Sequence, residues 1–282
     1  MNFGVYTNLT KDLKGLQTQK VCNSINNLLK NENDNLFLSN DLKNLGIKAQ
    51  YLTNEDLFKL CNVVVLLGGD GTILRVAELA SKYKTKILAL NLGSRGFLTE
   101  IPPNDLDQIL KDILSKNYCL DERFMIQAKI NKKVYIGLND VVVSRGDARA
   151  GRFCVYINGF LVDKYSSDGV IISTPTGSTA YNLSSGGPIL APDVSALVIT
   201  PIAAHSLHTR PLVTNSNNVI KININSVSMQ AQLNVDGIDV CKINQNEDVE
   251  ITKSKNSLLF IRTVTYNYYD RFLNKLLNWI II

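Results

Sequence analysis

The clearest chemical signal in this sequence is the run Gly68-Gly69-Asp70-Gly71-Thr72, which follows the apolar segment 62–67. Glycines at a strand-to-helix turn let the backbone approach a ligand closely, and the amides at a helix N-terminus attract phosphate. A carboxylate would repel phosphates, so Asp70 fits another task. It would accept a proton from a hydroxyl group, or hold a metal ion that bridges the phosphates. The alternative is an ordinary Asp in a glycine-rich turn.

The same loop lacks the signatures of two other phosphate-binding turns. No Gly-Lys-Ser/Thr sequence follows it, so it is not a Walker A loop, and its glycines do not match the Gly-x-Gly-x-x-Gly dinucleotide fingerprint. If a nicotinamide dinucleotide binds, the sequence favours a substrate to be phosphorylated over a hydride carrier.

Two further segments place polar side chains next to apolar strands. Residues 174–181 read Thr-Pro-Thr-Gly-Ser-Thr-Ala-Tyr and follow the apolar run 169–173, which predicts a densely hydrogen-bonded strand-to-helix turn. Tyr181 is a candidate to pack against a base or a ribose. Asn139 and Asp140 open another apolar run, and an amide beside a carboxylate can hold ribose hydroxyls or a base edge. Both segments also fit an ordinary turn and an ordinary strand end.

The elements that must position these residues alternate between strand and helix over residues 1–100. Continuous apolar runs predict buried strands, and apolar residues three or four apart predict helices. This alternation indicates a Rossmann-like α/β domain with a mainly parallel sheet. The predicted strands are 3–6, 36–38, 62–67 and 87–90, and the predicted helices are 11–30, 41–45 and 72–83.

The pattern changes after Pro102-Pro103. A short helix over 105–116, capped by Asn104, leads into a region of strand patterns and turn signals such as Asn158-Gly159. A last helical segment, 268–279, follows the strands. The predicted strands of this part are 123–130, 133–144, 153–158, 169–173, 196–200, 218–225, 229–235, 248–252 and 258–262.

The chain has 282 residues, enough for one large domain or two modest ones with cores of their own. From the change in pattern we predict an α/β nucleotide-binding domain over 1–100 and a β-rich domain over 101–262. A C-terminal helix over 263–282 completes the chain.

Composition and charge exclude several classes of protein. The net charge of +5 suits anionic ligands but is too small and too scattered for nucleic acid. The five cysteines are isolated and form no Cys-x-x-Cys pair, which argues against zinc and for a reducing compartment. The N-terminus reads as a strand rather than a secretory signal, and the apolar C-terminal end is far too short to span a bilayer. We therefore expect a cytoplasmic protein that binds neither nucleic acid nor membrane.

The motifs described above, together with further segments listed below, follow one another along the chain in an order that resembles the bacterial NAD kinase family over nearly its full length. The Gly68–Thr72 loop is shared with 6-phosphofructokinases and diacylglycerol-type lipid kinases, whereas the 174–181 string is specific to NAD kinases. The resemblance implies an α/β N-terminal domain, a β-rich C-terminal domain, a site between them and a C-terminal segment that returns to the first domain. Other matching segments are Asn139-Asp140-Val-Val-Val, Ser167-Asp168-Gly169, Gly186-Gly187-Pro188, His205-Ser206-Leu207 and Arg210-Pro211-Leu212.

The resemblance also implies roles for individual residues. Asp70 matches the catalytic base toward the ribose 2′-hydroxyl of NAD, Gly71 gives backbone contact beside it, and Gly68, Gly69 and Thr72 complete the phosphate loop. Asn139 and Asp140 match residues that hold ribose hydroxyls. Ala203 falls where a small residue reaches the site from a neighbouring subunit. The residues that fall where the family lines its adenine and nicotinamide pockets are Asp168, Thr179, Ala180, Tyr181, Asn182, Leu183 and Ser184.

Some residues leave two interpretations open. Arg75 lies where relatives place a basic residue near the diphosphate, and Arg149 belongs to an arginine-rich loop that suits phosphates, yet both also fit solvated side chains. Arg95 stands where the family has Leu in its Asn-x-Gly-x-Leu-Gly-Phe-Leu pattern, so it either disturbs the packing or meets a phosphate. We expect His205 to be a buried, hydrogen-bonded histidine without a catalytic role.

The expected reaction is in-line transfer of the γ-phosphoryl group of ATP to the 2′-oxygen of NAD, which gives NADP and ADP. A divalent cation such as Mg²⁺ accompanies ATP, and no permanently bound cofactor and no protein-held metal are expected. Homo-oligomers, dimers or tetramers, are usual in the family. Two alternatives are a related kinase acting on a lipid or sugar phosphate, and a non-catalytic NAD(P)-binding sensor. Polyphosphate as donor and NADH as acceptor also stay open.

Overall fold

The chain divides into two compact units. The computed structural model describes residues 1–29, 34–93, 96–99, 101–102, 105–146, 151–206, 209–224, 230–245 and 247–280, with 276–280 as backbone only. Unit 1 comprises Met1–Glu122 and Leu258–Ile282, and unit 2 comprises Arg123–Ser257.

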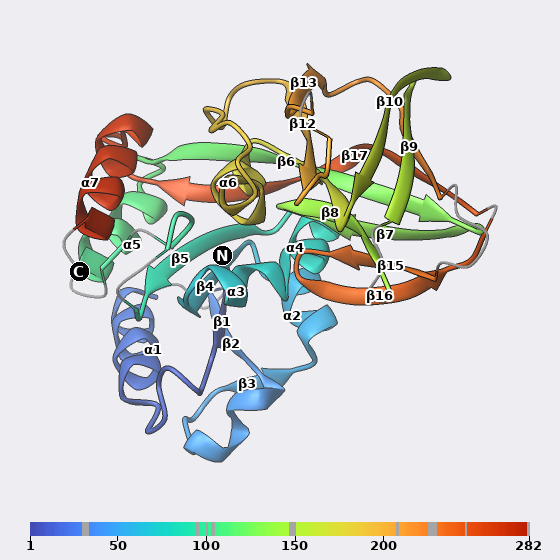
Figure 1. The fold of residues 1–282 in the computed structure, drawn as a ribbon. Coiled ribbons are helices and arrows are strands. Elements are labelled where there is room, and N and C mark those ends of the chain that lie inside the picture. The colour runs from blue at the N-terminus through green and yellow to red at the C-terminus, as the bar shows by residue number, and fades with distance from the viewer. Residues whose placement is uncertain are drawn as a thin grey trace. The chain divides into compact units, whose positions relative to one another are not determined.

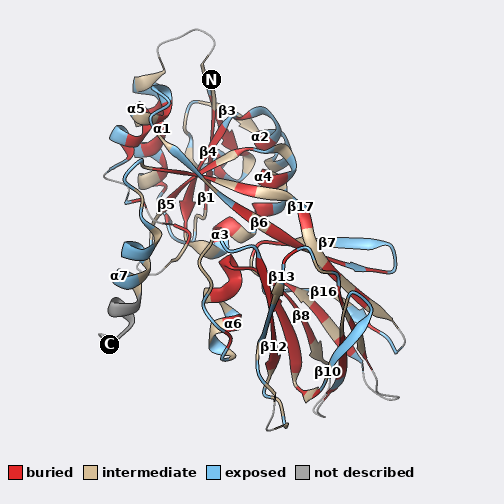
Figure 2. Ribbon diagram, turned by 90° about the horizontal axis from the view of Figure 1, so that it is seen from above, coloured by how far each residue is buried: buried red, intermediate tan, exposed pale blue. Residues whose placement is uncertain are grey.

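Unit 1 is built on a parallel sheet. Its strands are β1 Asn2–Thr7, β2 Asn35–Ser39, β3 Gln50–Leu52, β4 Val63–Gly68, β5 Lys86–Asn91 and the end of β17 Asp248–Arg262. The order is β5-β4-β1-β2-β3, and β17 runs parallel to β5 on its other side (Figure 1). Every residue of β4 is buried (Figure 2), because both faces of the sheet are covered, and this explains its uninterrupted apolar sequence.

Unit 1 also contains helices. They are α1 Leu16–Leu28, α2 Asn54–Leu60, α3 Asp70–Leu74, α4 Ala77–Tyr83, α5 Leu106–Leu114 and α7 Tyr268–Ile280, with a 3₁₀ turn, η1, at Asn40–Leu45. Of these helices, α1 and α5 contribute apolar side chains to the core of the sheet. Helix α1 begins at residue 16 rather than at the predicted residue 11, because the Asp12 carboxylate accepts the backbone N–H groups of Gln17 and Thr18 at 3.2 and 2.8 Å.

The predicted helix 72–83 is divided in two. Helix α3 already begins at Asp70, and it ends before Arg75. The N–H of Val76 donates to the carbonyl of Ile73 at 3.0 Å, a three-residue spacing that tightens the chain, and α4 starts at Ala77. Asp70 therefore stands at the first position of its helix.

Both ends of unit 1 lie elsewhere than the sequence indicated. The apolar side chains of α5, including Ile109 and Ile113, join the core formed by β4 and α1, so unit 1 extends to residue 122 rather than 100. Ile261 joins the same core, which places the last part of β17 with unit 1 from residue 258 onward. The predicted cap Asn104 lies outside the described residues, and Asp105 is the N-cap of α5.

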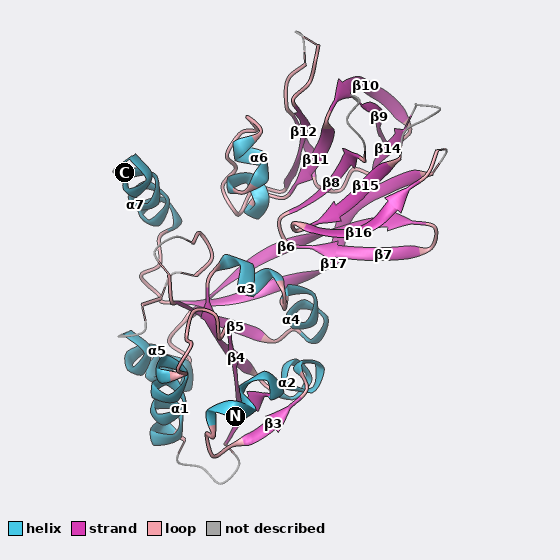
Figure 3. Cartoon of the chain, turned by 60° about the horizontal axis from the view of Figure 1, so that its bottom comes forward, coloured by secondary structure: helices cyan, strands magenta, loops and turns pink. Residues whose placement is uncertain are grey.

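Unit 2 consists of antiparallel strands in two layers, seen as magenta arrows in Figure 3. One sheet has the order β13-β12-β11-β8-β15-β16, and the other contains β10-β9-β14-β17, with the hairpin β6-β7. Val143 and Ile172 of the first sheet and Ile222 of the second belong to one buried cluster. The strands are β6 Cys119–Ile130, β7 Lys133–Gly137, β8 Asp140–Arg145, β9 Gly151–Ile157, β10 Phe160–Ser167, β11 Gly169–Ser173, β12 Ala196–Ile202, β13 Leu212–Asn215, β14 Ile220–Ile224, β15 Ala231–Val235 and β16 Ile238–Ile243.

The strand predictions for this unit need two corrections. The segment 133–144 is not one strand, because the ladder stops at Leu138-Asn139 and resumes as β8. The segments 248–252 and 258–262 are joined in the single strand β17. Strands β3, β10, β13 and β16 and helix α2 were not predicted, since each is short or half exposed and forms by pairing or packing with other elements.

Candidate functional site

The glycine-rich loop joins β4 to α3 in unit 1. Gly68 ends the strand, and a side chain there would collide with Thr72, so the turn requires glycine at this position. The Thr72 hydroxyl oxygen accepts the N–H of Gly69 at 3.3 Å and the amide of Asn8, also at 3.3 Å. Thr72 is itself buried, so the loop residue predicted to bind phosphate holds the turn together from inside.

The carboxylate of Asp70 is held by a second loop of unit 1. Oδ1 accepts the backbone N–H groups of Leu98 at 3.0 Å and Thr99 at 3.2 Å, and Oδ2 accepts that of Phe97 at 2.6 Å. Three donors from consecutive residues fix both the position and the rotation of this carboxylate. Within the described residues Oδ2 accepts this one bond, so a carboxylate oxygen retains acceptor capacity for a hydroxyl group.

The second loop must approach Asp70 very closely. A Cβ atom at Gly96 would lie 2.6 Å from Asp70 Oδ1 and 2.5 Å from Thr99 Oγ1, closer than atoms pack. The centroids of the Phe97 and Phe272 rings lie 6.5 Å apart, so α7 packs on the same loop. In the sequence this segment is marked only by its resemblance to the Asn-x-Gly-x-Leu-Gly-Phe-Leu pattern, and Arg95 lies outside the described residues.

Two other predicted residues, one in the glycine-rich loop and one at the end of α3, face solvent. Gly71 is exposed, and apart from its own helical turn no atom of the described residues lies within 4 Å of a Cβ built there, so its backbone is open to a ligand. Arg75 is exposed at the end of α3. Both positions are compatible with ligand contact, and for Arg75 the solvated interpretation stands equally.

In unit 2, the Asn139-Asp140 segment is held by a carboxylate that the sequence did not single out as functional. Asp236 accepts the backbone N–H groups of Leu138, Asn139 and Asp140 at 2.7, 2.7 and 3.1 Å. In the sequence the pair Asp236-Gly237 is a turn signal, which by itself indicates only a hairpin. Asp236 adopts a positive φ of 50° in that turn.

The two aspartates form an electrostatically costly pair. Burial raises the pKa of Asp140 to about 7, and the neighbouring charge of Asp236 adds to the effect. Burial also raises the pKa of Asp236, although its three backbone donors oppose the shift. Asp140 is 4% exposed, so its carboxyl group is a buried acid that changes its protonation state near neutral pH.

The predicted strand-to-helix turn follows β11 and consists of a 3₁₀ turn, η3 Thr176–Thr179, and helix α6 Tyr181–Ser184. Its hydrogen bonds are as dense as the hydroxyl content indicated. The Thr174 hydroxyl donates to the carbonyl of Leu138 at 2.7 Å, and the Thr174 N–H donates to the carbonyl of Asn139 at 2.9 Å. The turn and the Asn139-Asp140 segment are therefore brought together directly.

The side chains of this turn divide into internal and accessible groups. Asn182 is fully buried, and its amide donates to the carbonyls of Ser178 and Pro188, both at 3.0 Å, while its oxygen accepts the Thr200 hydroxyl at 2.7 Å. All these bonds are internal, so its side chain holds the turn rather than facing a ligand. Tyr181 is 47% exposed. Ser184 is also exposed, and Thr179, Ala180 and Leu183 are partly buried.

The other predicted residues of unit 2 lie at strand ends. Asp168, between β10 and β11, forms an ion pair with Arg145, whose Nε lies 2.8 Å from Asp168 Oδ1. Ala203 is exposed and adopts a positive φ of 46°. The prediction of a buried His205 was wrong, since it is exposed beyond the end of β12 and its backbone N–H donates to Ser166. Arg149, Leu207 and His208 lie outside the described residues.

No group of three or more His, Cys, Asp or Glu side chains in the described ranges is arranged to hold a metal ion. In the same ranges no helix has the length and apolar content that a membrane span requires.

Comparisons with known proteins point in one direction. The family model for the ATP-NAD kinase N-terminal domain matches residues 7–118, and that for the ATP-NAD kinase C-terminal domain matches residues 138–263. The chain is 42% identical over 221 residues to an NAD kinase of Caldicellulosiruptor bescii, covering 78% of this chain and 84% of that protein. It is 35% identical over 279 residues to an NAD kinase of Thermoanaerobacter pseudethanolicus, covering 97% and 98%.

Solved structures share the fold. The crystal structure of yeast NADH kinase complexed with NADH has a TM-score of 0.86 at 25% identity, covering 99% of this chain and 87% of that chain. An NAD kinase from Archaeoglobus fulgidus in complex with ATP has a TM-score of 0.77 at 23% identity and shares the fold over 98% of both chains. The predicted combination of an α/β and a β-rich domain is confirmed.

Proposed function

The chain belongs to the NAD kinase family, and we propose that it transfers the γ-phosphoryl group of ATP to the 2′-hydroxyl of the adenosine ribose of NAD. The products are NADP and ADP. The observation that carries this proposal is Asp70, a carboxylate on a glycine-rich strand-to-helix loop, held rigidly by three backbone donors.

Asp70 acts as the general base. Its fixed carboxylate takes the proton of the 2′-hydroxyl, the 2′-oxygen attacks the γ-phosphorus, and the bond to the β–γ bridging oxygen breaks as ADP leaves. A base already held in place loses little freedom in the transition state, which favours turnover. A divalent cation bound to the phosphates of ATP neutralises their charge, and it arrives with the nucleotide.

Residues of unit 2 bind NAD. Asn139 and Asp140 hold ribose hydroxyls, and Asp236 keeps their backbone in place. The exposed Tyr181 ring offers a flat surface to a base. Asp168, Thr179, Ala180, Leu183 and Ser184 complete the site, with Ala203 contributed by a neighbouring subunit of a homo-oligomer. Asn182 supports the turn from within.

The test is product formation by the purified protein. With NAD, ATP and Mg²⁺, the wild type forms NADP, and Asp70→Asn lowers kcat by at least about 100-fold because it cannot accept the proton. Asp107→Asn, a change at an exposed carboxylate of the same unit, keeps wild-type turnover. NADH is assayed in parallel, because a structural relative is an NADH kinase. Near-normal turnover of Asp70→Asn would rule out the base, and no product from the wild type would redirect the search to lipid and sugar phosphate acceptors.

A further inference from the structure

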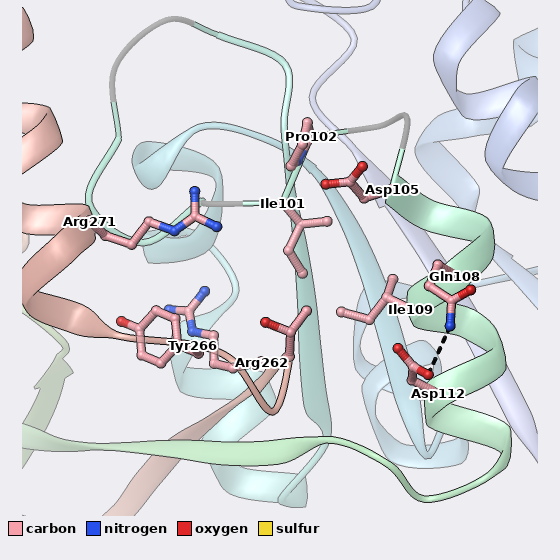
Figure 4. A pocket seen from close by; sticks show the side chains of 10 residues that line it. Ile101, Pro102, Asp105, Gln108, Ile109, Asp112, Arg262, Tyr266 and Arg271 are labelled. Carbon is pink, nitrogen blue, oxygen red and sulfur yellow. Dashed lines mark hydrogen bonds between the residues drawn. The ribbon is translucent and has the colours of Figure 1, made fainter.

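Arg262, the last residue of β17, is a buried cation in unit 1. It is 1% exposed, and its Nε lies 3.1 Å from Oδ2 of Asp121. Its guanidinium group lies over the rings of Phe260 and Tyr266, with centroid distances of 4.8 and 5.1 Å. Figure 4 shows the guanidinium beside the Tyr266 ring. A carboxylate and two aromatic faces therefore fix one orientation of this side chain.

The guanidinium also reaches the loop that holds Asp70. Nη1 donates to the carbonyl oxygen of Leu98 at 3.1 Å. That carbonyl belongs to the same peptide group as the N–H of Thr99, which donates to Asp70 Oδ1 at 3.2 Å. Because a peptide group is planar and trans, holding its oxygen fixes the direction of its N–H.

The positive charge adds a second effect. A hydrogen bond from a cation to a carbonyl oxygen polarises the peptide group, and the N–H at its other end becomes a stronger donor. The chain of contacts runs from Asp121 through Arg262 and the Leu98-Thr99 peptide to Asp70. The three hydrogen bonds that link these groups are 3.1 to 3.2 Å long.

We propose that Arg262 is a positioning residue for Asp70, acting through the Leu98-Thr99 peptide. This inference rests on the proposed function of Asp70 as the base. Arg262 contacts no substrate in this scheme, so its loss lowers turnover and leaves substrate affinity unchanged. Its role is to keep the carboxylate in the one orientation that receives the proton.

A cavity beside Arg262 provides an unusual test. It has a volume of about 240 Å³ and is lined by α5, the end of β17 and the start of α7 (Figure 4). Arg262 and Arg271 both line it, but of the side chains that the structure describes only that of Arg262 bonds to Leu98. Truncation of Arg262 would leave room for a free guanidinium ion to enter and occupy the vacated position.

The experiment compares Arg262→Ala, Arg262→Lys and the control Arg271→Ala with the wild type. We expect Arg262→Ala to lower kcat by about 10- to 100-fold, with KM for NAD and ATP within about threefold. Guanidinium chloride at low millimolar concentration should restore part of the kcat lost in Arg262→Ala, and sodium chloride at the same concentration should not. Arg262→Lys keeps the positive charge but not the planar arrangement of several N–H donors, so its kcat should lie between those of the wild type and Arg262→Ala. Arg271→Ala should match the wild type.

Amide exchange provides a direct readout. In Arg262→Ala the amides of Phe97, Leu98 and Thr99 should exchange faster, while those of β4 and β1 stay protected, whereas general destabilisation would move all of them together. Unchanged kcat in a folded Arg262→Ala, with or without a raised KM, would overturn this inference and leave the proposed role of Asp70 untouched. So would a lowered kcat that guanidinium does not restore. If Asp70→Asn keeps normal turnover, the proposed base itself fails.

Discussion

Asp236 accepts a 2.7 Å hydrogen bond from the backbone N–H of Asn139, which lies 97 residues earlier in the chain. The same carboxylate accepts the neighbouring N–H groups of Leu138 and Asp140. In unit 1 Asp70 accepts three consecutive N–H groups of residues 97–99 in the same way. Each unit thus uses one carboxylate to organise a segment without regular structure, but only Asp70 is proposed to react.

Removal of the Asp236 carboxylate should destabilise the protein. Asp236→Ala leaves three backbone donors without their acceptor, so we expect a loss of about 3 kcal/mol in the free energy of unfolding. Asp239→Ala, an exposed carboxylate in the same hairpin, should change it by less than about 0.5 kcal/mol. Urea denaturation of both variants measures this difference. If Asp236→Ala loses no more stability than Asp239→Ala, water replaces the carboxylate as the acceptor of these bonds.

The buried acid Asp140 should make stability depend on pH. Its pKa of about 7 in the native state lies above the value of about 3.9 of an unfolded chain. The native state therefore binds the proton more tightly, and stability falls as pH rises between these values, then levels off. The variant Asp140→Asn lacks this loss.

We expect Asp140→Asn to exceed the wild type in stability at pH 8 and not at pH 4. One pKa unit corresponds to about 1.4 kcal/mol, so the gain is at most about 4 kcal/mol. Urea denaturation between pH 4 and pH 8 measures both curves. If the two curves run parallel, Asp140 does not carry the dependence.

Gly96 should be intolerant of any side chain. In Gly96→Ala the new Cβ would displace the Asp70 carboxylate, and a shift of about 1 Å at a reacting group can cost about 100-fold in rate. Gly93→Ala is the matched control, since among the described residues its Cβ would meet only Asn91 Oδ1, at 3.7 Å, an ordinary contact. Steady-state kinetics should show a large fall in kcat for the first variant only. Similar kcat values for both would show that the loop moves aside.

Asn182 should act on stability rather than on the ligand. Asn182→Ala removes hydrogen bonds to Ser178, Pro188 and Thr200 in a buried position, which we expect to cost about 3 kcal/mol. Ser184→Ala, exposed on the same helix, should cost less than about 0.5 kcal/mol. Thermal denaturation separates the two, and a stable Asn182→Ala with weak NAD binding would restore the original site assignment.

Much of the architecture could be predicted because it is written in local patterns. The apolar run of β4 predicts a strand buried on both faces, and the apolar spacing in α5 and α7 predicts their amphipathic helices. Boundaries were less predictable. The true start of α1 depends on the carboxylate of Asp12, and α3 is divided from α4 where the N–H of the buried Val76 donates to the carbonyl of Ile73.

The candidate site was predicted as a set of residues but not as a structure. Asn182 and Thr72 carry polar groups suited to ligands, yet both are buried and bonded internally. His205 was expected inside and is exposed, because it lies beyond the end of β12, where the chain leaves the sheet. A residue's type indicates what its side chain can do, and the internal hydrogen bonds of Asn182 and Thr72 decide that these two side chains serve the fold.

The sequence by itself determined the glycine-rich loop, its single carboxylate and the hydroxyl-rich turn, because each is encoded in consecutive residues. Only the tertiary structure decided what holds them. Asp70 finds its donors 27 to 29 residues away, Asn139 is held by Asp236, and Arg262 reaches Leu98 across 164 residues. Such partners meet only because the sheets bring distant strand ends together, and no local pattern records which ends will meet.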